Sequence, residues 1–357
     1  MKTKWLVALA LVAAACGEKS ATSAAPSADA PKGDRTLHVL VWSDYLVPEL
    51  TAAFEKEFHC RVAETNFENN EELRAKLLAG NSGFDLVCPS DYTVALLVKD
   101  GVLDEIDTSR LTNLKNLSPR FDGKPYDAGH KHSVPYQWGV TGIAWRKSAL
   151  KEAPHSWKDL FDEKNLNAWS RKISMLNDGR ELAAAALLAQ GLSPNTRDEK
   201  EILKAEVELT MQRIVVAKYD SDNFGDALVA KEIDVAQGWS GTIANAQKED
   251  PDIGFVIPDE GALTYVDNWA IPKGAPEKAL ALEFMNYLLR ADVAAKAANE
   301  RRYASVNEAA KPMIDPEILK GTAYEDGGGT KKLYWVEDVG PEAGDAYKKL
   351  FSDLKNR

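Results

Sequence analysis

Residues 37–45 read LHVLVWSDY, a short apolar run that passes directly into an indole, a hydroxyl, a carboxylate and a phenol. The apolar run predicts a buried strand, and the four residues after it would stand at the carboxyl end of that strand. Aromatic faces attract positive charge and a carboxylate can neutralise it, so Trp42, Ser43, Asp44 and Tyr45 form one corner of a candidate cation-binding pocket. A Trp and a Tyr beside a strand are more often packed in the core, and this alternative stays open.

Outward from this stretch, short apolar runs alternate with amphipathic segments, a pattern typical of an α/β layer architecture. The extended segments 133–144 and 267–272 are expected to pass between two α/β units. In the first unit we expect strands over 37–41, 61–67 and 84–87, and helices over 48–58 and from Asn69 onward. Further along, we expect strands over 173–176, 235–239 and 255–257, and helices over 182–189 and 276–290.

A second polar and aromatic cluster follows the strand predicted over 84–87. It contains Ser90 and Tyr92. Ligands of open parallel sheets bind beyond the carboxyl ends of the strands. Both clusters occupy such ends, so we expect them on the same rim, a coincidence that core packing alone does not require.

Composition indicates an ordinary globular protein with an acidic bias. The chain has 357 residues, 45% hydrophobic and 28% charged, which is enough for two domains. Its formal net charge is -11, and it becomes -13 without residues 1–16, which contain two lysines and no acidic residue. This acidity argues against nucleic acid or an anionic membrane surface as the main partner, and it suits a small cationic ligand.

Residues 1–16 read as a signal peptide, because Lys2 and Lys4 precede an apolar run too short to span a bilayer. The run ends in AAAC, which resembles the lipobox of bacterial lipoproteins and predicts lipid attachment at Cys16. Ala13 replaces the leucine preferred there, and cleavage after an A-x-A site is the alternative. Residues 17–35, rich in Ser, Ala and Pro, are expected to form a disordered tether.

Two cysteines, Cys60 and Cys88, remain after residue 16. An exported protein can oxidise such a pair. Each lies in or beside a different predicted strand, so a disulfide and two separate thiols both stay open.

Seven motifs together resemble the bacterial periplasmic spermidine/putrescine-binding proteins of polyamine ABC transporters. The resemblance covers the chain from about residue 36, in the order and at the spacings of that family. The motifs are WSDY (42–45), FDLVCPSDY (84–92), SVPYQWG (133–139), NDGRE (177–181), YDSDN (219–223), EGALTYVDNWAIP (260–272) and WVEDVG (335–340).

The resemblance implies a type II periplasmic-binding-protein fold, two α/β lobes joined by crossover strands with a ligand cleft between them. Residues 36–138 and 269–333 would form lobe 1, and 139–268 with 334–357 would form lobe 2. The expected protein is a monomeric receptor outside the cytoplasm, without a cofactor or catalysis. It would capture spermidine or putrescine and deliver it to an ABC permease.

The resemblance also implies the site residues. Trp42, Ser43, Asp44, Tyr45, Ser90 and Tyr92 would make one wall, Asp178 and Glu181 would supply carboxylates from the second lobe, and Trp239, Tyr265, Asp267 and Tyr303 would complete the cleft. Two positions depart from the family: Tyr265 replaces a typical Trp, and Val336 replaces a Gln found in some members. Both departures bear on which polyamine is bound.

Each acidic candidate has an ordinary structural alternative. Asp178 and Glu181 have the D-x-x-E spacing of a helix capping box, in which both would satisfy backbone N–H groups. Asp267 lies in an apolar extended run, so it needs either a ligand ammonium or a nearby Arg or Lys.

Other functions also stay open. The same fold could bind an amino acid or another organic cation. An exported hydrolase or lyase could use Asp178 and Glu181 as an acid/base pair. His130 and His132 have a spacing that could hold a metal, although a surface loop is the expected reading because no further ligand supports them.

Overall fold

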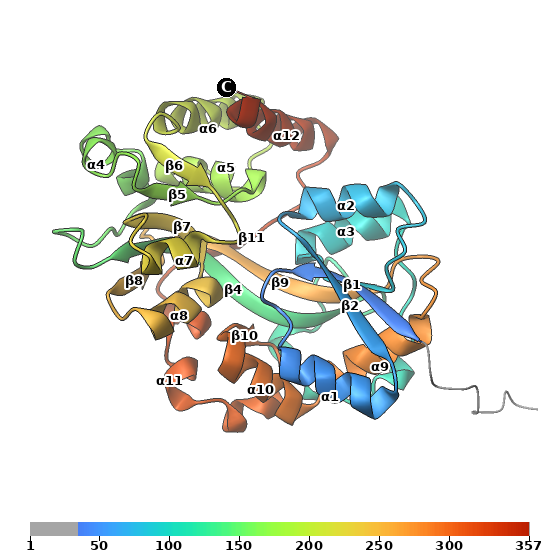
Figure 1. Ribbon diagram of the computed structural model, residues 1–357. Helices are drawn as coiled ribbons and strands as arrows, with labels where there is room; N and C mark the ends of the chain where they lie inside the picture. The colour runs from blue at the N-terminus through green and yellow to red at the C-terminus, as the bar shows by residue number, and fades with distance from the viewer. Residues whose placement is uncertain (1–34, 357) are drawn as a thin grey trace, which may run out of the picture.

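The computed structural model describes residues 35–356, in which strands of one twisted, curled sheet are covered by helices on both faces (Figure 1). The predicted signal peptide, Cys16 and nearly all of the predicted tether lie outside the described residues. The strands run in the order β2-β1-β3-β9-β4-β7-β5-β6, with β10 and β8 added to β4 and β11 added to β9. Their bounds are β1 Thr36–Trp42, β2 Arg61–Phe67, β3 Leu86–Val87, β4 Ser133–Arg146, β5 Ile173–Met175, β6 Val216–Tyr219, β7 Val235–Trp239, β8 Ile253–Val256, β9 Ala262–Ala270, β10 Ala304–Ser305 and β11 Leu333–Trp335.

The helices divide between the two lobes. The first lobe carries α1 Pro48–Phe58, α2 Asn70–Leu78, α3 Asp91–Asp100, α9 Lys278–Leu288 and α10 Ala291–Arg301. The second lobe carries α4 Glu163–Ala168, α5 Gly179–Ala189, α6 Glu199–Gln212, α7 Phe224–Val229, α8 Ser240–Glu249 and α12 Pro341–Asn356, and the short α11 Pro316–Leu319 lies near α10 (Figure 1).

The first lobe is built on β1, which pairs in parallel with β2 on one side and β3 on the other. Its apolar side chains, among them Leu37, Val39, Leu40 and Val41, are fully buried because helices cover both faces of this sheet. Parallel strands of this kind place their carboxyl ends at one rim, where the polar residues after β1 and β3 emerge.

Two long strands, β4 and β9, connect the lobes (Figure 1). Residues 133–140 of β4 pair with β9, and from Thr141 onward the same strand pairs with β7 instead. The extended segment predicted over 133–144 is therefore confirmed as strand. Of the segment predicted over 267–272, residues 267–270 are strand, because β9 runs from Ala262 to Ala270. These shared strands join the two lobes.

The second lobe contains the parallel set β7-β5-β6, with α5, α6 and α12 on one face and α7 and α8 on the other (Figure 1). Helix α5 is buried from Glu181 through Ala189 because its alanines let the sheet, α6 and α12 approach closely. Ser156 begins the turn at Trp157–Leu160 and forms a capping box with Asp159.

Some predicted bounds were wrong. Strand β3 covers only Leu86–Val87, because helix α3 begins only four residues later, at Asp91. The helix predicted over 276–290 is shorter, and Arg290 takes an extended conformation before α10 begins. Cys60 is half-buried and Cys88 fully buried, and both are free thiols. Cys60 and Cys88 therefore do not form a disulfide, and the alternative of two separate thiols is confirmed.

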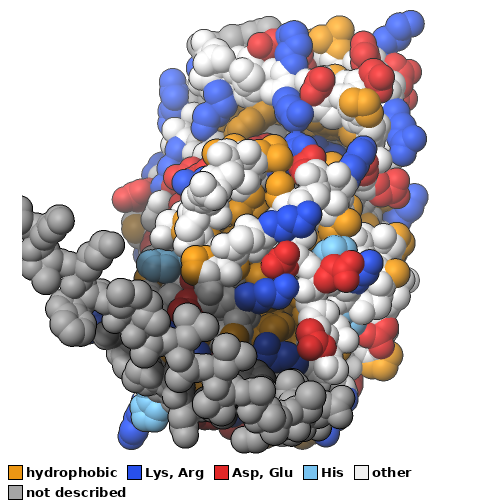
Figure 2. All heavy atoms as spheres, turned by 90° about the vertical axis from the view of Figure 1, so that its right-hand side faces the viewer, with side chains coloured by type: hydrophobic (Ala, Val, Ile, Leu, Met, Phe, Trp, Pro, Cys, Tyr) orange, Lys and Arg blue, Asp and Glu red, His pale blue; other side chains and the backbone are white. Residues whose placement is uncertain are grey.

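On the face seen from the right of Figure 1, acidic and basic side chains are mixed among apolar ones (Figure 2). The basic side chains visible there do not gather into one continuous patch. In the part of the chain from residue 35 to 356, no helix combines the length and apolar character needed to cross a bilayer.

Candidate functional site

All twelve residues expected to bind the ligand line a single cavity between the two lobes. The first lobe contributes the segment after β1, the start of α3 and the residue after α10. Strands β7 and β9, the start of α5 and the segment after β6 complete the wall. Sequence reasoning did not assign a ligand contact to the other lining residues, which are Asn70, Arg180, Ser221, Asp222, Thr242, Leu263, Thr264 and Val336.

The turn after β1 combines packing with exposure of one carboxylate. Trp42 packs on Phe67 with ring centroids 4.3 Å apart, and it meets the edge of Trp239 from the second lobe at 5.8 Å. Asp44 has φ 61°, a left-handed conformation that Asp tolerates better than most residues. Its exposed carboxylate lies 3.3 Å from the Arg301 guanidinium.

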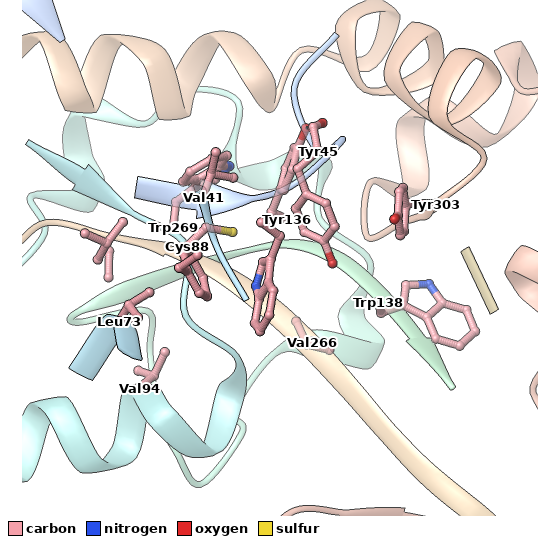
Figure 3. Close-up of a cluster of buried hydrophobic side chains, with 14 of the residues drawn as sticks. Val41, Tyr45, Leu73, Cys88, Val94, Tyr136, Trp138, Val266, Trp269 and Tyr303 are labelled. Carbon is pink, nitrogen blue, oxygen red and sulfur yellow. The ribbon is translucent and has the colours of Figure 1, made fainter. Parts of the chain in front are cut away.

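Trp42 and Tyr45 are core residues as well as cavity residues. Tyr45 is buried in one cluster with Val41 and Cys88 (Figure 3). Its ring lies 4.8 Å from Tyr303 and 6.2 Å from Tyr136. The packing alternative is therefore confirmed for both rings, which also form part of the cavity surface.

Asp267, on β9, is 2% exposed and has only neutral hydrogen-bond donors around it. The Tyr45 hydroxyl donates to Oδ2 at 2.5 Å, and the Ser90 hydroxyl donates to Oδ1 at 2.6 Å. No Lys or Arg among residues 35–356 forms a salt bridge with it, so the alternative of a protein cation as its partner is wrong. Burial raises the pKa of Asp267 to about 6, and the two hydroxyl donors oppose that rise.

Ser90 is held in place from helix α2. Asn70 donates from Nδ2 to the Ser90 hydroxyl at 3.1 Å and accepts from the Ser90 backbone N–H at 3.1 Å. This pair of bonds aims the Ser90 hydroxyl at Asp267. Tyr92, two residues on, is half-buried, and its hydroxyl oxygen is enclosed without a hydrogen-bond partner.

Asp178 caps helix α5, as the capping alternative predicted. Its Oδ1 accepts from the backbone N–H groups of Arg180 and Glu181 at 2.9 and 3.0 Å. The reciprocal half of the box is not formed, because Glu181 turns toward the cavity. Its Oε1 accepts from the Thr141 hydroxyl at 2.9 Å and from the Trp239 indole N–H at 3.1 Å.

One carboxylate oxygen of Glu181 therefore has no hydrogen-bond partner in the cavity. This oxygen, Oε2, is buried without any hydrogen-bond partner. Burial first, and Asp178 second, raise the pKa of Glu181 to about 8. Burial also raises the pKa of Asp178 itself, against its two backbone donors. A cation placed here would be paired and would return these acids to their charged forms.

Arg180 does not neutralise either acid by direct contact. Its guanidinium donates to Asn195 Oδ1 at 2.8 Å and to the Glu337 carbonyl at 3.2 Å, and it lies 4.6 Å from the Tyr347 ring centroid. Arg180 is the one basic side chain among the residues that line the cavity.

Asp222 is the acidic lining residue that sequence reasoning missed. It follows β6 within the YDSDN motif, at a strand end like those of the predicted clusters. That position was the signal that could have identified it. Burial raises its pKa, and hydrogen bonding from the Ser43 hydroxyl of the facing lobe opposes the rise.

Two glycines make room for the aromatic walls. A Cβ on Gly241 would lie 2.1 Å from the Tyr303 ring, and a Cβ on Gly139 would lie 2.5 Å from the Tyr265 hydroxyl oxygen. Any larger residue would displace these rings. The lobes also touch through polar contacts: Asn177 donates to Glu68 at 2.9 Å, and the hydroxyls of Thr242 and Tyr303 lie 3.0 Å apart.

The two histidines of the HKH segment have other partners. His130 Nε2 lies 3.1 Å from Asp122, and His132 Nδ1 lies 3.3 Å from the Asp104 carbonyl. No cluster of three or more potential metal ligands occurs within residues 35–356.

The model of one protein family, described as bacterial extracellular solute-binding protein, matches residues 49–325. The chain belongs to this family. The solute-binding protein is 35% identical, over 98% of each sequence, to the spermidine/putrescine-binding periplasmic protein 1 of Haemophilus influenzae. It is also 31% identical to the putrescine-binding periplasmic protein PotF of Escherichia coli, over 100% of this chain and 99% of that one.

Solved structures confirm the fold of the solute-binding protein. A spermidine/putrescine ABC transporter structure from Listeria monocytogenes superposes with a TM-score of 0.85 at 30% identity, covering 90% of this chain and 99% of that one. The Tp0655 lipoprotein of Treponema pallidum gives 0.79 at 27% identity, covering 90% and 100%. The expected periplasmic-binding-protein fold, with two α/β lobes and crossover strands, is confirmed.

Proposed function

We propose that this solute-binding protein captures an aliphatic polyamine outside the cytoplasm and delivers it to the membrane permease of an ABC transporter. One observation carries the proposal: Asp267 and Glu181 are buried in one cavity, and neither forms a salt bridge among the described residues. A buried carboxylate without a cation is costly, and a ligand with two ammonium groups removes that cost at both positions. The names of the relatives, which include spermidine and putrescine, support the same ligand class.

Aromatic rings would hold the methylene chain between the ammonium groups. Four aromatic side chains line the cavity and offer apolar ring surface: Trp42, Trp239, Tyr265 and Tyr303. A cation over such a face gains about 0.5–2 kcal/mol, depending on how fully water is removed. Charge-assisted hydrogen bonds to Asp267 and Glu181 would supply the larger share of the affinity.

Closure of the lobes would follow from this arrangement. Asp267 belongs to β9 and pairs with first-lobe hydroxyls, whereas Glu181 belongs to α5 of the second lobe. A ligand that contacts both Glu181 and the first-lobe residues of the cavity, such as Trp42 and Tyr303, has higher affinity for the closed than for the open arrangement, and it therefore shifts the population toward closure. The closed form is the one that a permease would need to recognise.

We infer that the ligand is bound without turnover. The hydrolase or lyase alternative needs Asp178 and Glu181 as an acid/base pair, but Asp178 is occupied as the helix cap. The same-fold alternative of an amino acid ligand needs a cationic partner for the ligand carboxylate. The one cavity-lining base, Arg180, already donates to Asn195 and Glu337.

The direct experiment is mass spectrometry of small molecules released by denaturing the purified protein from residue 17 onward, followed by calorimetry on the stripped and refolded protein. We expect an unmodified polyamine and saturable binding of putrescine or spermidine. Arginine, glutamate and choline serve as matched ligands with a different charge arrangement. Tighter binding of any of these three, or chemical change of the amine during incubation, would reject the proposal.

The remaining features of the proposal concern the chain ends and assembly. We propose that the signal peptide in residues 1–16 is removed and that a lipid is attached at Cys16. Lobe 1 would comprise residues 36–138 and 269–333, and lobe 2 would comprise residues 139–268 and 334–357. The protein would be a monomer and would bind no nucleic acid. Radiolabelled palmitate should enter the wild-type protein but not Cys16→Ser in cells. Incorporation into both would place the lipid elsewhere.

A further inference from the structure

The C-terminal helix α12 packs against the start of α5, where Asp178 and Glu181 enter the ligand cavity (Figure 1). Three side chains of α12 contact the NDGRE motif there: Tyr347, Phe351 and Lys355. They are spaced four residues apart, so they lie one above another on one face of the helix. These three residues form the α12 stripe.

The first two members of the α12 stripe fix the backbone and one side chain at the start of α5. Phe351 packs so closely on Gly179 that a Cβ at this glycine would lie 2.9 Å from the Phe351 Cβ. The Arg180 guanidinium lies 4.6 Å from the Tyr347 ring centroid, a cation–aromatic contact that holds this side chain. Neither contact uses an acid of the motif, so both acids are left for the cavity.

The third member, Lys355, takes part in a contact between the lobes. Its Nζ donates to Asn177 Oδ1 at 2.6 Å, and Asn177 Nδ2 donates to Glu68 Oε2 at 2.9 Å. Glu68 follows β2 of the first lobe, whereas Lys355 lies at the end of α12. The Asn177 amide therefore joins an ammonium group of one lobe to a carboxylate of the other.

The charges at the two ends strengthen this chain of hydrogen bonds. A hydrogen bond with one ionised partner is roughly twice as strong as a neutral one. Linked hydrogen bonds also polarise one another, so an amide that accepts from an ammonium group becomes a better donor. The ammonium group of Lys355 lies 5.6 Å from the Phe351 ring centroid, which restricts its position. Loss of the Lys355 charge should therefore weaken the bond between Asn177 and Glu68.

Asn177 also connects this chain to the ligand cavity. It directly precedes the helix cap Asp178, and its backbone N–H donates to the hydroxyl of Ser221, which lines the cavity. Lys355 itself is not a lining residue, and it forms no salt bridge with Glu68 in the described part of the chain. Any effect of Lys355 on the ligand must pass through Asn177.

We propose that the α12 stripe positions the acids of the NDGRE motif for the ligand, and that Lys355 strengthens ligand binding through Asn177 and Glu68. Lys355 is thus a positioning residue, because it acts on the ligand only through other side chains. This inference rests on the proposed polyamine function.

The test is a double-mutant cycle in which calorimetry measures putrescine affinity. Lys355→Met keeps a long side chain beside Phe351 but removes the charge, and we expect about threefold weaker binding. Glu68→Ala should weaken binding by about three- to tenfold. The double variant should bind about as well as Glu68→Ala alone, because both changes break the same chain of bonds. Lys355→Arg keeps the charge and should bind within about twofold of the wild type.

Lys349→Met is the matched control, because Lys349 lies on the same helix and pairs with Asp353 of α12. Its affinity should equal that of the wild type. Chemical denaturation should give nearly the same midpoint for the wild type, Lys349→Met and Lys355→Met, since both lysines are exposed. If Lys355→Met does not fold, Asn177→Ala removes both bonds of the chain and should match Glu68→Ala in affinity.

Three results would overturn the inference: unchanged affinity in both Lys355→Met and Asn177→Ala, an equal loss in Lys349→Met, or losses that add fully in the double variant. A wild-type protein that binds neither putrescine nor spermidine would instead reject the proposed function. That failure is seen before any variant is made, so the two are distinguishable.

Discussion

The Tyr45 hydroxyl donates a hydrogen bond to Asp267 Oδ2 at 2.5 Å, although 222 residues separate the two in sequence. Ser90 donates to the other carboxylate oxygen, and no basic residue within 35–356 forms a salt bridge with it. Neutral donors orient the carboxylate and lower the cost of its charge without cancelling it. The charge of Asp267 is thus not cancelled by a basic side chain of residues 35–356, as the proposed cationic ligand requires.

Asp267→Asn should weaken polyamine binding by at least about 100-fold, because a buried hydrogen-bonded ion pair loses one partner. Folding should not suffer, since burial already raises the pKa of this acid and its ionised form is costly in the folded state. Calorimetry and thermal denaturation measure the two effects. Asp234→Asn is the control, because that acid pairs with Arg146 at 2.8 Å away from the cavity. Unchanged affinity in Asp267→Asn would remove this residue from the site.

Two substitutions at Asp178 should separate helix capping from ligand binding. Asn caps a helix about as well as Asp, so Asp178→Asn should keep stability within about 0.5 kcal/mol while lowering affinity. Asp178→Ala should in addition lose about 1 kcal/mol of unfolding free energy. Chemical denaturation compared with calorimetry checks this. Equal affinity losses without any stability difference between the two variants would contradict the capping role.

Binding should strengthen as pH rises through the range set by the cavity acids. The pKa of Glu181 is raised from 4.5 to about 8 and that of Asp267 from 3.8 to about 6, so both must release protons to pair with an ammonium group. Affinity should rise by up to about tenfold per pH unit for each proton released, with both acids contributing below about pH 6 and Glu181 alone contributing between pH 6 and about pH 8. Calorimetry in buffers of different ionisation enthalpy measures that release.

The ligand-free protein should show the opposite pH dependence in stability. An acid whose folded pKa is raised holds its proton more tightly when folded, so its contribution is largest below the unfolded pKa and is lost as pH rises through the folded pKa. For Glu181 that window runs from 4.5 to about 8. The thermal shift caused by putrescine should therefore be larger at pH 8 than at pH 5.5, and Glu181→Gln should flatten the difference.

Asp44→Asn should weaken binding less than Asp267→Asn, by about tenfold or less, because Asp44 is exposed and already shares its charge with Arg301 at 3.3 Å. Stability should change little for the same reason. Calorimetry of the two variants side by side gives the comparison. A larger loss at Asp44 would mean that Arg301 moves away when ligand binds.

Glu68→Ala should weaken binding by about three- to tenfold without removing a cavity-lining residue, because Glu68 joins the lobes through Asn177 at 2.9 Å. Small-angle X-ray scattering should show that this variant needs more ligand to reach the compact form. Glu57→Ala is the control, since its partner Arg290 lies in the same lobe. Identical titrations for wild type and Glu68→Ala would exclude a role in closure.

Much of the first lobe could be predicted from sequence, because local patterns decide it. The apolar run at 37–41, the helix with Pro48 at its first position and the cap at Asn69 all depend on residues within one turn or one strand. Helices α6 and α12 were not predicted. Each buries its apolar face against the other and against α5, so their partners are far apart in sequence.

The residues that line the cavity could be predicted from sequence, but their contacts with one another could not. All twelve expected residues line one cavity, yet which acid caps, which pairs and which stays free depends on contacts between distant segments. Asp178 and Glu181 share one motif and both line the cavity, but Asp178 caps the helix, whereas Thr141 and Trp239 hold the carboxylate of Glu181. Asp222 was missed because its carboxylate lines the cavity beside Ser43 of the other lobe, a contact between segments far apart in the sequence.

The strand order also sets the sequence in which the molecule can be completed during synthesis. Strand β9 inserts between β3 and β4, so the sheet of the first lobe stays incomplete until residue 270 has left the ribosome. Helix α12 packs on α5 and α6 through its buried Leu350 and Leu354, about 140 or more residues after the end of α6 has been made. Neither core is complete until these late segments have been made, and a chain that lacks part of its core is less stable against unfolding.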